Sequence, residues 1–258
     1  MNDLYVGKRL GEIWGYTTDG FIMDAAEAAE QSKRQSYISN TWIPGDIRYA
    51  DLNGDGVVNE GDSEKGPINT LSNHGDKSII GNETPRYRFN INLGLSWKNF
   101  DVRALFEGVL KRDLWLGNEV FWGFSGVWNS AINDYHVDNS WSEDNPNAYY
   151  PVPLFNSDRS RKTQTKYLQN ASYIRLRDLT IGYTLPKKWL EPVGISQLKI
   201  FFSGQNLWEA TGLYKYVDPD MTGNTYQKSS DGMVGTLNSD MKSYPFCRSY
   251  SFGINLTF

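Results

Sequence analysis

The sequence predicts an all-β chain, and more narrowly the C-terminal strands of a large antiparallel transmembrane β-barrel with long extracellular loops. Three observations support this prediction: strict alternation of apolar and polar residues over long segments, many aromatic residues, and connections that are alternately short and long. Alternation is clearest over 250–258, within a strand predicted over 246–258. Successive side chains of a strand point to opposite faces, so this segment has one apolar face and one polar face.

Two neighbouring segments, 86–97 and 100–110, alternate in the same way, and a transmembrane strand needs about 9–11 residues with apolar side chains outward. The side chains expected to face lipid are Tyr87, Phe89, Ile91, Leu93, Leu95, Phe252, Ile254 and Leu256. Those expected to face the lumen are Arg88, Asn90, Asn92, Ser251, Asn255 and Thr257. A slip of one residue in register would exchange the two sets.

Three further strands are predicted from less regular patterns of alternation. The segment 172–185 changes parity between Leu176 and Leu179, and a β-bulge near Arg177 and Asp178 would return its apolar residues to one face. The segment 198–208 alternates at first and then loses the pattern. A sixth strand is expected over 4–16. Outer-membrane barrels have short periplasmic turns and long extracellular loops, so 98–99 and 186–197 are predicted as periplasmic and 17–85, 111–171 and 209–245 as extracellular.

Composition narrows the class of protein. The 258 residues carry a net charge of −4, so nothing suggests a nucleic-acid partner. Aromatic residues make up 14% of the chain, as the aromatic girdles of a barrel require. No apolar run reaches the roughly 18 residues that a membrane helix needs. The two histidines, His74 and His136, have no partners at catalytic or metal-ligand spacing, so we do not expect an enzyme.

Residues 51–62 have the spacing of a twelve-residue calcium loop, with a glycine at the sharp turn in position 6. The predicted ligands are Asp51, Asn53, Asp55, the Val57 carbonyl, Asn59 and Asp62. These oxygens suit Ca²⁺, although Asp62 stands where such loops usually carry the longer glutamate. The alternative is a turn that keeps its shape without metal, because Asn, Asp and Gly favour turns.

The loop 111–171 is rich in aromatic residues, including Trp115, Trp122, Trp128 and Trp141. Three interpretations stay open for these tryptophans. They could stack on a sugar substrate, anchor a partner protein, since interfaces favour Trp and Tyr, or pack the loop on itself. We regard them as candidates for substrate or partner contact.

Several short motifs occur in order along nearly the whole chain, at 15–16, 19–21, 44–56, 81–87, 97–101, 141–146, 173–183, 204–208, 217–220 and Phe258. These motifs resemble the SusC/RagA family of TonB-linked outer-membrane proteins. Each motif alone is weak, but together they are specific.

The resemblance implies a 22-stranded barrel with an N-terminal plug in the outer membrane of a Gram-negative bacterium. It implies import of oligosaccharides, peptides or other large nutrients, with a SusD-like surface lipoprotein as lid and energy from the TonB complex. A signal peptide, a TonB box, a plug and most barrel strands are not found in this sequence, so we expect a C-terminal portion of such a transporter. In this class the terminal phenylalanine is the assembly signal, which assigns that role to Phe258.

One alternative of another class remains, a soluble calcium-stabilised β-sandwich that binds carbohydrate. Sandwich strands are usually about 5–6 residues long, whereas the segments predicted here reach about twelve. A need for detergent during purification would distinguish the barrel strands from the sandwich.

Overall fold

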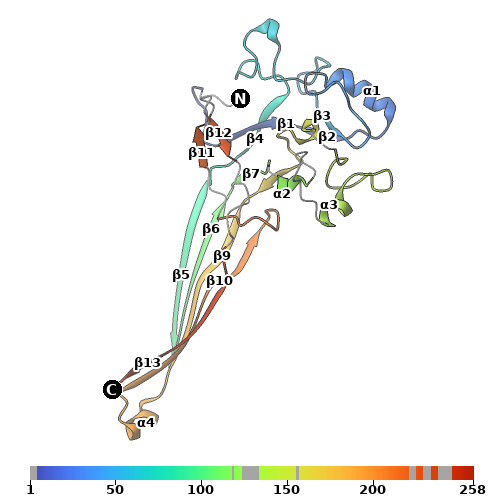
Figure 1. Cartoon of the computed structure of the whole chain (residues 1–258). Coiled ribbons are helices and arrows are strands. Elements are labelled where there is room, and N and C mark those ends of the chain that lie inside the picture. Colours follow the sequence, from blue (N-terminus) through green and yellow to red (C-terminus); the bar gives the residue numbers. More distant parts are fainter. Residues whose placement is uncertain are drawn as a thin grey trace. The chain divides into compact units, whose positions relative to one another are not determined.

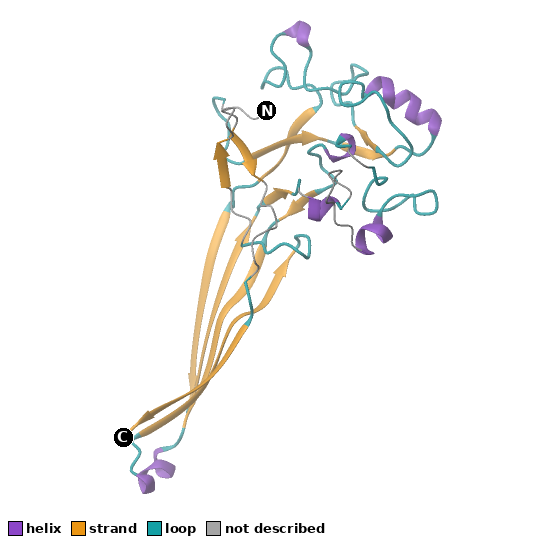
Figure 2. Ribbon diagram, in the orientation of Figure 1, coloured by secondary structure: helices purple, strands orange, loops and turns teal. Residues whose placement is uncertain are grey.

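The computed structural model describes residues 5–117, 119–123, 134–154, 157–220, 225–228, 234–237 and 246–258. The chain divides into two units (Figure 1). Unit 1 comprises residues 1–84, 113–169 and 222–243, and unit 2 comprises residues 85–112, 170–221 and 244–258. Strands dominate and the helices are short (Figure 2). In the described part of the chain, no helix is long and apolar enough to cross a membrane.

Unit 2 is built on one antiparallel sheet of five strands in the order β13-β10-β9-β6-β5. The strands are β5 (Tyr87–Trp97), β6 (Phe100–Leu110), β9 (Tyr173–Thr184), β10 (Gln197–Thr211) and β13 (Ser249–Thr257). They lie close to the ranges 86–97, 100–110, 172–185, 198–208 and 246–258 predicted from alternation, and β10 is three residues longer at its end. The short helices α4 (Lys187–Leu190) and η3 (Glu191–Val193) connect β9 to β10.

The pairing register places apolar residues of all five strands on one face, although Leu105, Val109 and Phe201 lie on the other. Leu93 pairs with Ala104, Val102 with Ile181, and Ile181 with Phe202, which in turn pairs with Phe252. The opposite face carries the polar set, in which Gly94, Arg103, Thr180, Ser203 and Ser251 form one row across the five strands. Most side chains of β5 and β13 are exposed on both faces. Exposed apolar side chains on one face of long strands fit the strand set of a barrel, whose outer face meets lipid.

A β-bulge at Arg177 explains the change of parity in β9. Leu105 pairs with Asp178 but Phe106 pairs with Leu176, so Arg177 is the extra residue. The bulge predicted near Arg177 and Asp178 is therefore confirmed. β10 carries a matching irregularity between Gln205 and Trp208. Asn206 lies there at a φ of 52°, which Asn tolerates better than most residues.

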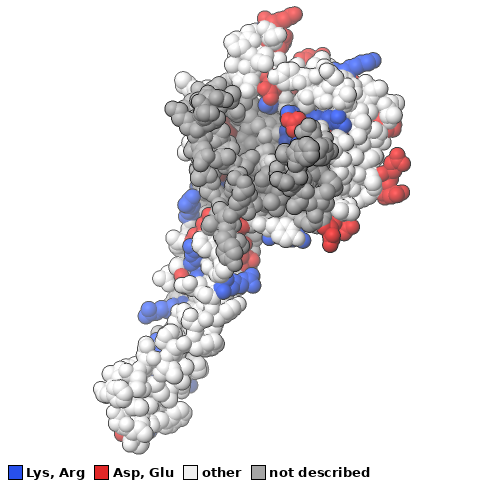
Figure 3. All heavy atoms as spheres, viewed as in Figure 1, with Lys and Arg blue, Asp and Glu red and all other residues white. Residues whose placement is uncertain are grey.

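The two kinds of connection leave the sheet at opposite ends. Trp97 pairs with Phe100 across the two-residue turn, and Lys199 pairs with Thr184 near the α4 connection, beside the last residues of β13. The long connections follow Leu110 and Thr211 at the other end. The half of the sheet that leads to α4 carries few charged side chains in the view of Figure 3. This arrangement within unit 2 agrees with the predicted alternation of short and long connections.

Unit 1 contains short elements around a core of its own. Its strands are β1 (Glu12–Tyr16), β2 (Thr18–Phe21), β3 (Ile47–Tyr49), β4 (Lys77–Asn82), β7 (Asp113–Trp115), β8 (Leu168–Asn170, whose last residue falls in unit 2), β11 (Thr225–Lys228) and β12 (Val234–Leu237). Its helices are α1 (Ala25–Arg34), α2 (Glu119–Trp122), α3 (Asp134–Asn139), η1 (Ser63–Lys65) and η2 (Arg159–Arg161). Tyr16, Ile22, Ile47, Phe121 and Tyr167 are almost fully buried.

One predicted strand is shorter than expected. The strand expected over 4–16 is only the five residues of β1, and it pairs with β4 rather than with the five-stranded sheet. The segments 17–85 and 111–171, predicted as extracellular connections, carry many of the strands, helices and core residues of unit 1. His136 is buried in α3, and its Nε2 lies 2.9 Å from the Phe121 carbonyl oxygen.

Candidate functional site

The loop 51–62 folds around its own acidic and amide side chains in unit 1. The Asp51 carboxylate accepts hydrogen bonds from the amides of Gly54 at 2.7 Å and Gly56 at 2.8 Å. Asp55 accepts from the Val57 amide at 2.8 Å, and Asn59 accepts from the Gly61 amide at 2.6 Å. Gly54 and Gly56 have φ values of 75° and 88°, which only glycine adopts at little cost.

Asp76, which the loop pattern did not include, holds the ends of the loop together. Its buried carboxylate accepts from the amides of Leu52 at 2.7 Å and Asn59 at 2.9 Å. Burial raises the pKa of Asp76 despite these donors. Burial also acts to raise the pKa of Asp51, but hydrogen bonds from Gly56 and Gly54 outweigh it and the pKa falls. Asp51 is thus held in the ionised form that a metal ligand needs.

Asp62 lines the same hollow as Asp55, Val57 and Asn59 but makes further contacts of its own. Its side chain accepts from the Glu64 amide at 2.9 Å, as the cap of η1, and lies 3.6 Å from the Lys65 ammonium. Within the described residues, no group of three or more His, Cys, Asp or Glu side chains is placed to hold a metal ion. The remaining donors of the loop, from Asp51, Asn53, Asp55, Val57 and Asn59, are all oxygens and fit a hard cation, so calcium binding stays a prediction.

Replacing Asp51 with alanine tests that prediction. If the loop binds Ca²⁺, calcium raises the melting temperature of the native protein, because a ligand that binds only the folded state stabilises it. The shift should disappear in Asp51→Ala, which in the absence of metal should also lower the free energy of unfolding by about 0.5–1.5 kcal/mol because two exposed amides lose their acceptor to water. Thermal unfolding in calcium and in chelator gives both values.

Asp138→Ala is the matched control, since Asp138 is an exposed carboxylate outside the loop. It should keep the full calcium shift. An equal shift in Asp51→Ala, or none in the native protein, would contradict calcium binding at this loop.

The aromatic residues of 111–171 form a buried cluster. Phe121, Trp122, Trp141, Tyr150 and Tyr167 are all buried, and Trp122 lies edge to face against Tyr167 with ring centroids 4.7 Å apart. For Trp122 and Trp141 the structure favours the interpretation that the loop packs on itself. Trp115 is half-buried and packs against Trp122 with 5.8 Å between ring centroids, and Trp128 lies outside the described residues.

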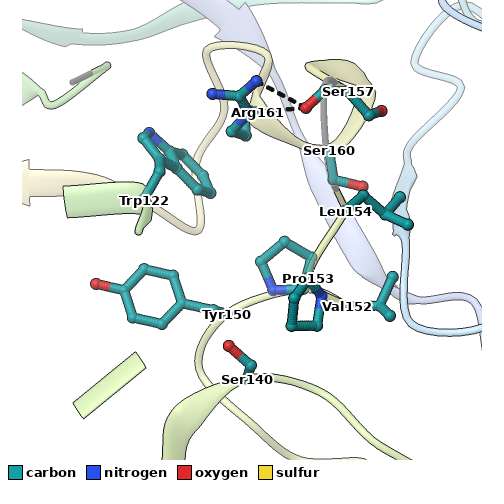
Figure 4. A pocket seen from close by; sticks show the side chains of 10 residues that line it. Trp122, Ser140, Tyr150, Val152, Pro153, Leu154, Ser157, Ser160 and Arg161 are labelled. Carbon is teal, nitrogen blue, oxygen red and sulfur yellow. Dashed lines mark hydrogen bonds between the residues drawn. The ribbon is translucent and has the colours of Figure 1, made fainter. Parts of the chain in front are cut away.

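A small pocket borders this cluster (Figure 4). Trp122, Tyr150, Pro153 and Arg161 are among its lining residues, and Arg161 is held by the Ser157 carbonyl oxygen. Its free volume of about 30 Å³ is room for a water molecule rather than a sugar or an amino acid. We therefore do not assign substrate binding to this pocket.

Unit 2 carries a cluster of ion pairs that the sequence pattern did not reveal. Arg175 of β9 pairs with Glu209 and with Asp218, the latter at 2.6 Å, and its side chain is only 3% exposed. Arg177, the bulge residue, pairs with Asp220 at 3.2 Å and with Glu107 at 3.5 Å. Arg175 and Arg177 are two residues apart in the sequence, and so are Asp218 and Asp220. This equal spacing is visible in the sequence, but only the fold shows which arginine pairs with which aspartate.

Comparison with known proteins shows which proteins this chain is similar to. Over 253 residues, 98% of this chain, the sequence is 28% identical to TonB-dependent receptor P3 of Formosa agariphila. Over 229 residues, 84% of the chain, it is 24% identical to TonB-dependent receptor P26 of the same organism. The chain is related to TonB-dependent receptors. It spans only 22% and 20% of the length of these two relatives, and no protein-family profile matches it.

Solved structures support the fold of this relative of TonB-dependent receptors. The RagAB peptide transporter matches 96% of the chain with a TM-score of 0.57 at 23% identity, and the chain covers 23% of that structure. The RagAB peptide importer in its closed-closed state matches the same share with a TM-score of 0.57 at 24% identity. At this identity the likeness concerns the fold.

Proposed function

We propose that the chain contributes strands and extracellular loops to the barrel of a TonB-dependent outer-membrane transporter of the SusC/RagA type. The observation that carries this proposal is the sheet of unit 2, whose five strands share an uninterrupted apolar face and an opposite polar face. Lipid on one side and a water-filled lumen on the other account for both faces. A soluble sandwich would bury one of them against a second sheet.

The partners follow from this assignment. The transporter would sit in the outer membrane of a Gram-negative bacterium, draw energy from the TonB complex through its N-terminal part, and pair with a SusD-like surface lipoprotein. Its cargo would be a large nutrient, either an oligosaccharide or a peptide. The 51–62 loop, in unit 1, would lie outside the membrane and bind Ca²⁺.

Uptake by cells tests the function. Cells that carry the full-length protein should accumulate labelled oligosaccharides or peptides in a manner that requires TonB, and deletion of the gene should abolish this accumulation. A protein that fractionates with soluble material, or uptake that is unchanged by loss of TonB, would contradict the transporter assignment.

Phe258 provides a second test, because its ring is 83% exposed directly after β13 and shares the parity of Leu256 and Ile254. Loss of this exposed ring should lower the free energy of unfolding by about 1 kcal/mol or less, well below the loss of about 3–5 kcal/mol for a buried Phe→Ala change. If Phe258 is the assembly signal, its deletion should nevertheless strongly reduce outer-membrane abundance. Abundance and the stability of refolded protein in detergent should be measured together. Normal abundance would remove the assembly role.

A further inference from the structure

A hollow of about 340 Å³ lies on the polar face of the unit 2 sheet. Its lining comes from three parts of the unit, namely the bulged stretch of β9 and β10, the segment 215–218, and the residues before β13. Those that matter here are Arg175, Asn206, Glu209, Tyr216, Asp218 and Phe246. This volume is within the range of about 300–1,000 Å³ typical of small-ligand sites.

Two buried polar atoms of this lining have no hydrogen-bond partner among the described residues. They are the Arg175 Nη1, a donor, and the Asn206 Oδ1, an acceptor. The nearest carboxylate oxygen to Nη1, on Asp220, is 3.7 Å away, beyond hydrogen-bond distance. The other nitrogens of both side chains are engaged, Arg175 with Glu209 and Asp218, and Asn206 with the Cys247 carbonyl oxygen. Buried polar groups are normally paired, so these two atoms point to a missing partner.

The charges around the hollow cancel. Glu107, Glu209, Asp218 and Asp220 stand against Arg175, Arg177, Lys215 and Arg248. Each carboxylate of the set already faces a guanidinium, and the set as a whole has no net charge that would favour a charged ligand. An uncharged ligand that can both accept from Nη1 and donate to Oδ1 fits better, and a hydroxyl group does both at one atom.

Two aromatic rings complete the lining. Tyr216 is 53% exposed and Phe246 is 43% exposed. The guanidinium carbons of Arg177 and Arg175 lie 4.8 Å and 5.4 Å from the Phe246 ring centroid, which holds that ring in place. Half-exposed rings beside polar groups offer a flat apolar surface for the C–H face of a sugar.

We propose that this hollow is a subsite for an uncharged sugar unit of an oligosaccharide. The inference rests on the proposed transporter function, since it places the hollow on the lumen face and selects oligosaccharide over peptide as the cargo. It assigns Arg175 Nη1 and Asn206 Oδ1 to one hydroxyl network and Tyr216 and Phe246 to the ring face.

Binding to the purified full-length protein tests the proposal without transport. The probes are maltotriose, cellotriose, laminaritriose and xylotriose, with N-acetyl-trialanine amide as the uncharged peptide, and titration calorimetry is done in a zwitterionic detergent without a sugar headgroup. At least one trisaccharide should bind. Phe246→Ala and Asn206→Gly should each weaken its binding about tenfold, the value of one hydrogen bond or ring contact.

Matched variants separate lost contacts from lost structure. Phe246→Tyr keeps a ring and should retain binding, and Trp189→Ala removes an exposed ring on α4, away from the hollow, and should also retain it. Binding of the peptide alone, of none of the probes, or equal loss in Trp189→Ala would overturn the subsite. Binding in detergent does not require TonB or uptake. Such a result would therefore not contradict the transporter assignment, which the uptake experiment tests.

Discussion

Replacing Asp46 with alanine is expected to lower the free energy of unfolding by about 3–5 kcal/mol, the cost of breaking a buried ion pair from one side. The Asp46 side chain is fully buried in unit 1. It lies 2.7 Å from the Arg159 guanidinium, accepts from the Ser160 hydroxyl at 2.8 Å, and accepts from the Ile43 amide at 3.0 Å. The substitution leaves a buried guanidinium without its counter-charge.

Asp19→Ala is the control for this prediction, because Asp19 also pairs with an arginine, Arg48 at 2.9 Å, but its side chain is 58% exposed. An exposed pair is worth about 0–1 kcal/mol, so the control should be nearly neutral. Chemical denaturation followed by tryptophan fluorescence gives both values. Similar small losses in the two variants would show that the Asp46 pair does not hold unit 1 together.

Arginine at position 93 should impair folding into a bilayer, whereas arginine at position 92 should not. Leu93 lies on the apolar face near the middle of β5, and the neighbouring Asn92 lies on the polar face. A lysine or arginine on the lipid face near the bilayer midplane costs about 2–4 kcal/mol, and lumen positions tolerate charge. The free energy of folding into liposomes should therefore be less favourable for Leu93→Arg by this amount.

The two positions are adjacent and receive the same side chain, so a difference between the two variants reports only which face of the sheet carries the charge. Folding can be followed by the shift in gel mobility of the full-length protein after refolding into liposomes. Equal losses for Leu93→Arg and Asn92→Arg would mean that the sheet does not separate lipid from water.

The strands of unit 2 could be predicted because each is long enough for the period of two to be unmistakable. Even the bulge at Arg177 followed from a change of parity in the sequence. The short strands of unit 1 offered no such signal, since β2 and β3 have only four and three residues. Their position depends on contacts between distant segments, such as the hydrogen bond from the Tyr49 hydroxyl to the Arg159 carbonyl oxygen.

The candidate sites, like the strands, could be predicted where the signal is local in sequence and not where it depends on distant residues. Local spacing in 51–62 predicted a twelve-residue calcium loop or a turn of the same residues, but it could not include Asp76, which lies well beyond the loop in sequence. Nor could spacing show that Asp62 also caps η1. The tryptophans at 122 and 141 were ambiguous, because abundant aromatic residues serve binding surfaces and cores alike, and only the fold shows them buried. The Arg175 cluster joins β9, β10 and the segment 218–220, a pairing that exists only after folding.

The central claim is that the two faces of the unit 2 sheet meet lipid and water, and a cysteine scan of β5 measures this directly. Cys247, the only cysteine of this chain, and every cysteine elsewhere in the full-length protein are first replaced by serine, and single cysteines are then placed at positions 89 to 94. A fluorophore on each cysteine should be quenched by brominated lipid at 89, 91 and 93, whereas a water-soluble quencher should act at 90, 92 and 94. Uniform quenching along the strand, or the inverse pattern, would contradict the account.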